Sequence, residues 1–282
     1  PRFDNYAFGA GLTIGTIHDD GFTINVGALV AILLPGPVIM IEGKANLLKQ
    51  RGENGKSAEG ALYALIVFDG LAETFQMNVD INYTLEDVIT VGGGMEAFFH
   101  FNDNSVWYIY IGRKDPESKR IRAEVISIIS ANAYFIVDPK AIVFGAAAGL
   151  DLKLEYQPLV IRLILRIAFE IGLFFKQPQL TGFVELYGEI SILIFGWGIK
   201  LILRTLLEGS APQPWWIHGL ARVEVSLPFP LPDFEAQIEF TWGEGEQPAR
   251  VPLLLGASAI HPKELGRSWE LSTTEEQAPI VP

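Results

Sequence analysis

The chain has 282 residues, a formal net charge of −12 and no cysteine. The missing thiols exclude disulfides and thiolate metal sites, and the acidic balance argues against a nucleic-acid partner, because phosphate binding requires a basic face. Hydrophobic residues make up 49% of the sequence and charged residues only 19%, so the chain can bury a large core.

The dominant pattern in the chain is an alternation of apolar and polar residues with the period of a β-strand. In residues 76–85, Met77 and Val79 point to one side, whereas Asn78 and Asp80 point to the other. This alternation is typical of a sheet with one buried and one hydrated face.

The next segments also predict strands. Residues 91–101 and 105–112 flank the turn-forming sequence NDN and predict a hairpin. Residues 120–130 follow a polar break and predict a further strand, and residues 141–156 predict another.

The most apolar stretch, residues 158–175, is long enough to suggest a transmembrane helix. Arg162, Arg166 and Glu170 lie inside it, and charges at the centre of a bilayer are costly, so we expect no transmembrane helix. As a strand, the stretch carries these three charges on one face and only apolar residues on the other. Its β-branched and aromatic content favours the strand over a helix.

Residues 180–209 form a run so long that it must bend, and Gly188, Gly196 and Gly198 are the natural places. About ten long strands in series with short turns imply an antiparallel meander. We therefore expect an all-β fold: a large curled antiparallel sheet with few or no helices, as a meander, a barrel-like roll or an open trough.

Three prolines, Pro228, Pro230 and Pro232, separate two alternating runs near residue 230. Proline cannot donate to a sheet ladder and extends the residue before it, so we predict a stiff structural corner between two strands. The apolar residues between the prolines are expected to cap the open end of the core: Leu227, Phe229 and Leu231.

Composition changes after residue 243. We expect one large β domain over residues 1–243 and an extended Pro/Glu-rich tail or linker over residues 244–282, with residues 251–255 docked on the sheet.

The first residues contain neither an initiator Met nor a signal segment, which suggests a mature product or a piece of a longer protein. The compartment stays open; a secreted or particle-associated location is slightly favoured over the cytoplasm.

Several short motifs occur in the second half of the chain: Phe195-Gly196-Trp197-Gly198, Pro212 and Pro214, Gly219, Leu231-Pro232-Asp233 and Trp242-Gly243. In these motifs the chain resembles a family of long, uncharacterised, β-rich bacterial proteins known only as a domain of unknown function. The resemblance covers roughly residues 91–243 and implies a fragment of a larger β-rich protein, with no activity to transfer.

No pattern predicts a catalytic, cofactor-binding or metal-binding residue. The four histidines are scattered without ligand spacing, and Asp19 and Asp20 fit an Asp-Gly turn better than a calcium loop. Glu185 and Glu189 lie on one strand face, where arginines such as Arg162 or Arg166 would make them structural ion pairs.

We therefore expect a non-enzymatic structural or interaction module that acts as a scaffold through an extended apolar sheet surface. The alternative is a carrier that binds lipid or another apolar ligand in a β groove. Expected partners are other modules of the same polypeptide or a homo-oligomer. The candidate groove or interface residues are Ile164, Phe174, Ile190, Ile192, Ile194 and Trp197.

Overall fold

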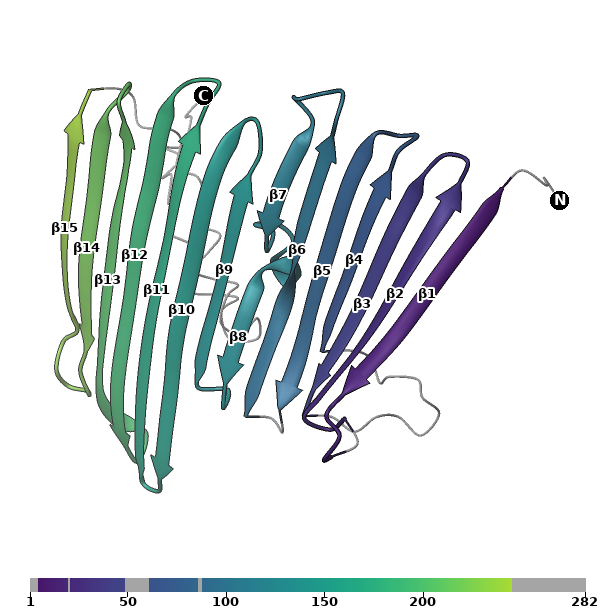
Figure 1. The fold of residues 1–282 in the computed structure, drawn as a ribbon. Coiled ribbons are helices and arrows are strands. Elements are labelled where there is room, and N and C mark those ends of the chain that lie inside the picture. Colours follow the sequence, from purple (N-terminus) through teal and green to yellow (C-terminus); the bar gives the residue numbers. More distant parts are fainter. Residues whose placement is uncertain (1–4, 20, 49–60, 86–87, 245–282) are drawn as a thin grey trace, which may run out of the picture.

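The computed structural model describes residues 5–19, 21–48, 61–85 and 88–244, which form one antiparallel sheet (Figure 1). The expected all-β fold with a large curled antiparallel sheet is confirmed. The strands are β1 (Tyr6–Gly15), β2 (Ile24–Leu34), β3 (Val38–Leu47), β4 (Leu62–Asp69), β5 (Thr74–Leu85), β6 (Ile89–His100), β7 (Trp107–Ile111), β8 (Ile121–Val125), β9 (Ile129–Val137), β10 (Ala141–Tyr156), β11 (Leu159–Phe174), β12 (Gln179–Ile194), β13 (Trp197–Ala211), β14 (Trp216–Ser226) and β15 (Phe234–Gly243).

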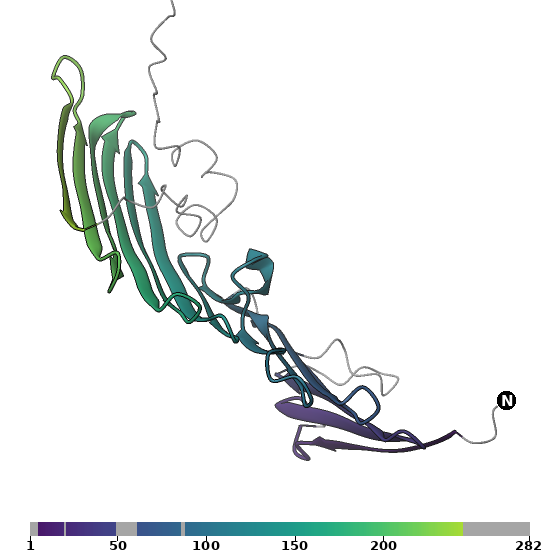
Figure 2. The ribbon, with the colours of Figure 1, turned by 90° about the horizontal axis from the view of Figure 1, so that it is seen from above.

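The sheet is a single curved layer, as Figure 2 shows from above. Strands follow one another across it in chain order, with β1 at one end and β15 at the other. These two strands do not pair with each other. Of the forms that the sequence predicted, the described residues therefore adopt an open, curved meander.

One position of the meander is divided between two short strands, β7 and β8. Both pair antiparallel with β6 on one side and with β9 on the other. The chain leaves the sheet after Ile111, forms the short 3₁₀ turn η1 (Glu117–Lys119) and returns at Ile121. The polar break predicted in this region is therefore an insertion that stands on the sheet.

The four longest strands, β10–β13, form the middle of the C-terminal half. The stretch that could be confused with a helix is the strand β11, which pairs along its whole length with β10 and β12. Its Val, Ile and Phe content suits a pleated surface, and strand pairing satisfies every interior backbone group. The strand prediction is thus confirmed.

Two predicted details were wrong. Residues 120–130 do not form one strand, because a tight turn at Ile126 and Ser127 separates β8 from β9. Both residues have positive φ angles, 52° and 54°, which the sequence does not signal with glycine or asparagine. In the long glycine-containing run the chain turns at Phe195 and Gly196, where φ is +55° and +78°. The bend predicted at Gly196 is therefore confirmed, whereas Gly188 and Gly198 lie within strands.

The proline corner joins β14 to β15. It contains a turn in which the Leu231 amide donates to the Pro228 carbonyl at 3.1 Å, and the Leu227 amide donates to the Asp233 carboxylate at 2.9 Å. Pro230 and Pro232 lie within or just after this turn. Phe229 is 83% and Leu231 is 56% exposed, so the predicted capping of the core by these two residues was wrong.

The predicted domain boundary coincides with the end of β15 at Gly243. The proposed tail lies, apart from Glu244, outside the described residues, and so does the predicted docking of residues 251–255.

Candidate functional site

The pairing register divides the sheet into two faces of opposite chemistry. Directly paired residues lie on one face, and successive residues alternate between faces. When the register is followed from Ile161 in both directions, every charged residue of the described strands lies on the face opposite Ile161. The face of Ile161 carries apolar and tyrosine side chains, glycines and a single threonine, Thr205. We call it the apolar face and the other the polar face.

The apolar face is richest in long aliphatic side chains over β11 and β12. Most of them are substantially exposed: Leu165 is 48% and Ile192 is 44% accessible to solvent. The apolar face includes Leu159, Ile161, Leu163, Leu165, Ile167, Phe169, Ile171 and Leu173 of β11 and Leu180, Val184, Leu186, Ile190, Ile192 and Ile194 of β12.

The insertion with η1 stands on the concave side of the sheet (Figure 2). Its Arg113 and Lys114 bind Glu96 and Glu170 of the polar face, so the polar face lines the concave side. Side chains crowd on the inside of a curve, and the burial pattern follows this geometry. Among the buried non-glycine residues of the strands, only Ala97 lies on the apolar face. The convex apolar face is therefore the accessible one.

The centre of the apolar face is hollowed where small residues of neighbouring strands meet. A depression of about 320 Å³ lies over β8–β11. Its floor is made of alanines, and larger apolar residues surround them. The alanines of this face that line the depression are Ala123, Ala131, Ala133, Ala146 and Ala148, and the larger residues are Val91, Ile121, Ile167 and Phe169.

The structure divides the six residues predicted for a groove or interface between the two faces. Ile164 lies on the polar face between Arg162 and Arg166 and is only 4% exposed, and Phe174 lies on the same face at the end of β11. Four of the six gather on the apolar face at one end of β12 and β13, namely Ile190, Ile192, Ile194 and Trp197.

The apolar face also extends well beyond the region that the sequence analysis selected. It continues through β1–β6 and through β14 and β15, for example at Phe8, Ile41, Phe240 and Trp242. Within each strand that carries charged residues, those residues share one parity, so the alternation marks the same face along the sheet. The predicted interface residues were nevertheless chosen only from residues 164–197.

The charges of the polar face contact one another across strands. Arg162 binds Asp151 at 2.8 Å, and Lys200 binds Glu189 at 3.2 Å. The expected partner of Glu189 was Arg162 or Arg166; the ion pair that forms uses Lys200 of the other neighbouring strand. Burial raises the pKa of Glu185, an effect that the charge of Arg204 partly offsets.

A tyrosine separates two arginines in the same region. Tyr187 lies with its ring 5.6 Å from the guanidinium carbons of both Arg166 and Arg204, and its hydroxyl donates to Glu189 at 2.5 Å. Burial and this carboxylate raise the pKa of Tyr187. The Tyr187 ring lies between the two positively charged guanidinium groups and attracts both through cation–π interactions.

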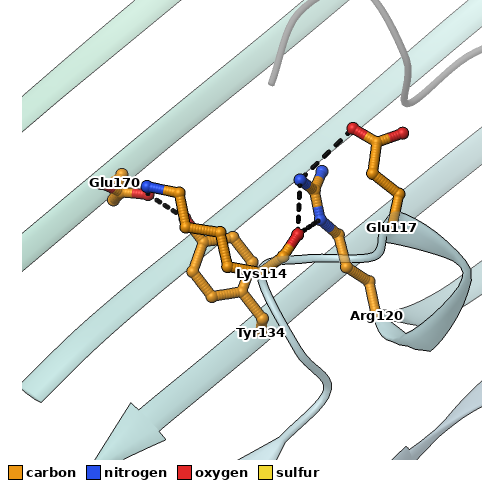
Figure 3. Close-up of polar contacts among 5 residues, drawn as sticks. All are labelled: Lys114, Glu117, Arg120, Tyr134 and Glu170. Carbon is orange, nitrogen blue, oxygen red and sulfur yellow. Dashed lines mark hydrogen bonds and ion pairs between the residues drawn. The ribbon is translucent and has the colours of Figure 1, made fainter. Parts of the chain in front are cut away.

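The insertion is fixed to the polar face by the contacts drawn in Figure 3. The Arg120 side chain is only 2% exposed; it donates twice to the Lys114 carbonyl, at 3.1 and 3.0 Å, and pairs with Glu117 at 3.3 Å. Lys114 reaches Glu170 of β11 at 2.7 Å, and the Tyr134 hydroxyl of β9 donates to the same carboxylate. These contacts tie the insertion to two strands beneath it.

His218 and Asp19 serve as local cross-links. His218 bridges three strands, because its ring nitrogens lie 3.0 Å from Glu208 of β13 and from Glu239 of β15. Asp19 closes the turn between β1 and β2: hydrogen bonds from Thr16 and Thr23 lower its pKa to about 2. Asp20 lies outside the described residues. No group of three or more potential metal ligands occurs among the residues that were described.

Comparison with family models, with curated proteins and with solved structures found no match. The resemblance to long β-rich bacterial proteins therefore stays a prediction. Within the described ranges, no helix is both long and apolar enough to cross a membrane.

Proposed function

We propose that this chain is a non-enzymatic structural module that holds a second protein layer against its apolar face, within a larger β-rich protein. The observation that carries the proposal is the absence of charge from one whole face of the described strands. An exposed apolar patch far above a few hundred Å² is typical of an interaction surface.

The size of the face supports a protein layer as its partner. Fourteen strand positions about 4.8 Å apart, with strands about 40 Å long, give a face on the order of 2,500 Å². A standard interface needs only about 800 Å² from each partner. Layered packing of apolar sheet faces is the usual way in which β-proteins remove such a surface from water.

The alternative, a lipid carrier, draws less support from the curvature. A trough that encloses an acyl chain needs apolar side chains on its concave side, and here the concave side carries the charged residues. The cross-strand ion pairs of that side also favour a structural role over a catalytic one, because they leave the carboxylates of Asp151 and Glu189 engaged with cations of neighbouring strands.

The proposal is tested by one substitution on each face at adjacent residues. Leu154 lies on the apolar face and is 43% exposed, whereas Lys153 lies on the polar face. We expect the purified chain to self-associate in sedimentation velocity, since a face of this size does not stay in water. Leu154→Asp should raise the concentration of half-dissociation at least tenfold, equivalent to about 1.4 kcal/mol.

The matched control is Lys153→Asp, which adds the same side chain and should leave association unchanged. Ile192→Asp should act like Leu154→Asp. Equal effects of Leu154→Asp and Lys153→Asp, or no effect of either, would refute the role of the apolar face. A co-purifying lipid at fixed stoichiometry in native mass spectrometry would replace the proposal with the carrier alternative.

A further inference from the structure

The two edges of the sheet, β1 and β15, have properties that natural edge strands avoid. Among the described residues, no strand pairs with the outer side of either. Edge strands are usually protected from further pairing by charged side chains, above all lysine, by prolines or by bulges. Both strands are ten residues long and contain neither lysine nor proline; β1 contains no charged residue at all, and β15 carries only Glu235 and Glu239.

The backbone groups that face outward can be assigned from the ladder. The Thr16 amide donates inward to Ile24, and the Glu244 amide donates inward to Trp215. Inward and outward groups alternate along an antiparallel strand. The outward groups therefore belong to the odd-numbered residues of both β1 and β15, whereas the even-numbered residues of both carry the apolar face.

The direction of the two edges is also complementary. The meander has an even number of strand positions, because β7 and β8 share one, so β15 runs antiparallel to β1. If one copy lies beside another in the same orientation, β15 of the first faces β1 of the second as an antiparallel neighbour. The apolar faces of both copies then lie on the same side.

The side chains match across this junction. With Ala10 opposite Ile238, the apolar face brings the aromatic residues of both edges together, and such cross-strand pairs stabilise a sheet. On the polar face, Gly9 and Gly11 leave room for Glu239 and Gln237. Pairing of β1 with a second β1 would instead set glycine against glycine. The facing aromatic pairs are Tyr6 with Trp242 and Phe8 with Phe240.

We propose that copies of this chain join edge to edge, β15 of one copy adding to β1 of the next, and so continue the sheet with one apolar and one polar side. The contact is heterologous, since each copy uses two different edges, and it therefore yields rings or open chains of copies. This inference does not rest on the function proposed above, because it concerns backbone edges rather than the apolar face.

Disulfide trapping tests the junction, and the absence of native cysteines makes the background clean. Directly opposite residues have the separation that a disulfide requires. Ala10→Cys and Ile238→Cys proteins, mixed and oxidised mildly, should give a dimer containing one of each chain. Each protein alone should give at least tenfold less dimer. Absence of the mixed dimer, or equally fast self-linking of Ala10→Cys, would overturn the proposal.

A second variant addresses the hydrogen bonds of the junction. Thr13→Pro removes an outward amide without touching the ladder between β1 and β2, and Thr13→Val keeps that amide. Trapping between Ala10→Cys and Ile238→Cys should fall at least tenfold in the Thr13→Pro background and persist in the Thr13→Val background. If trapping survives Thr13→Pro, the edges do not pair through this ladder. Leu154→Asp, which weakens association through the apolar face, is the comparison variant and should leave trapping between the edges unchanged.

Discussion

At the scale of single residues, the polar face contains one carboxyl group that burial disfavours. Glu185 lies in β12, where burial raises its pKa and Arg204 only partly compensates. Folding therefore favours the protonated form of this group. The protonated Glu185 side chain therefore contributes stability at low pH, and this contribution is lost as the pH rises through the pKa of Glu185 in the folded state.

We expect Glu185→Gln to stabilise the protein at pH 7, with a rise in melting temperature of about 2 °C, equivalent to roughly 1 kcal/mol. The gain should shrink below about pH 4, where the carboxyl group is protonated in both states. Thermal unfolding from pH 3.5 to 8 measures this difference. Glu155→Gln, at an exposed position with a 58% accessible side chain, is the control and should show no such trend. A loss of stability at pH 7 in Glu185→Gln would show that its ionic contacts outweigh its burial.

At the scale of elements, the insertion between β7 and β8 depends on one arginine. Arg120 is buried over Tyr134, with its guanidinium carbon 5.4 Å from the ring centre, and it binds the Lys114 carbonyl twice. Hydrogen bonds from a charged group contribute about 1.5–3 kcal/mol each. The insertion should therefore become more mobile when the guanidinium group of Arg120 is removed.

We expect Arg120→Met to expose the bond after Glu117 to a glutamate-specific protease, with cleavage at least tenfold faster than in the parent chain. The reason is the loss of the bonds to Lys114 and Glu117 while the apolar stem of the side chain is kept. Lys119→Met is the control, because the Lys119 side chain is 52% exposed and its pair with Glu96 contributes little. Equal cleavage in both variants would contradict the role assigned to Arg120.

The elements also show what the sequence could and could not predict. The faces of β5 and β11 follow directly from alternation, and β10 has the bounds expected for it. The turn at Ile126 and Ser127 was missed because no turn-forming residue marks it. Ile164 was wrongly grouped with the exposed interface residues. It occupies an even-numbered position of β11 and therefore shares the polar face with Arg162 and Arg166.

At the scale of the whole molecule, the sheet behaves like a linear array. Extensive strand contacts occur only between neighbours in the sheet, as in repeat proteins whose stability is a sum of local terms. The edge pairing and the apolar-face partner that we propose could not be predicted from alternation, since both proposals depend on how many strand positions the chain fills and which way the layer curves.

We expect damage at one end of the array to leave the other end intact. Asn46 is 2% exposed and links β2 to the start of β4 through hydrogen bonds to Asn25 and Ala61. In Asn46→Ala, combined with Thr13→Pro to keep the edges unpaired, amide exchange in β2–β4 should speed up at least tenfold. Exchange in β10–β13 should change less than twofold. Uniform acceleration throughout the sheet would mean that it unfolds as one cooperative unit.

The curvature of the layer also sets how the two sides tolerate change. On the inner side, a methyl group added at Gly145 would come within 2.6 Å of the Tyr134 ring, whereas on the outer side a methyl added at Gly43 meets no atom within 4 Å. The outer side is not open everywhere, because a methyl added at Gly219 would come within 2.4 Å of the Phe240 ring. An enlarging substitution should therefore be tolerated at Gly43 and rejected at Gly145 and Gly219, so that the tolerance of each position follows its immediate neighbours in the curved layer.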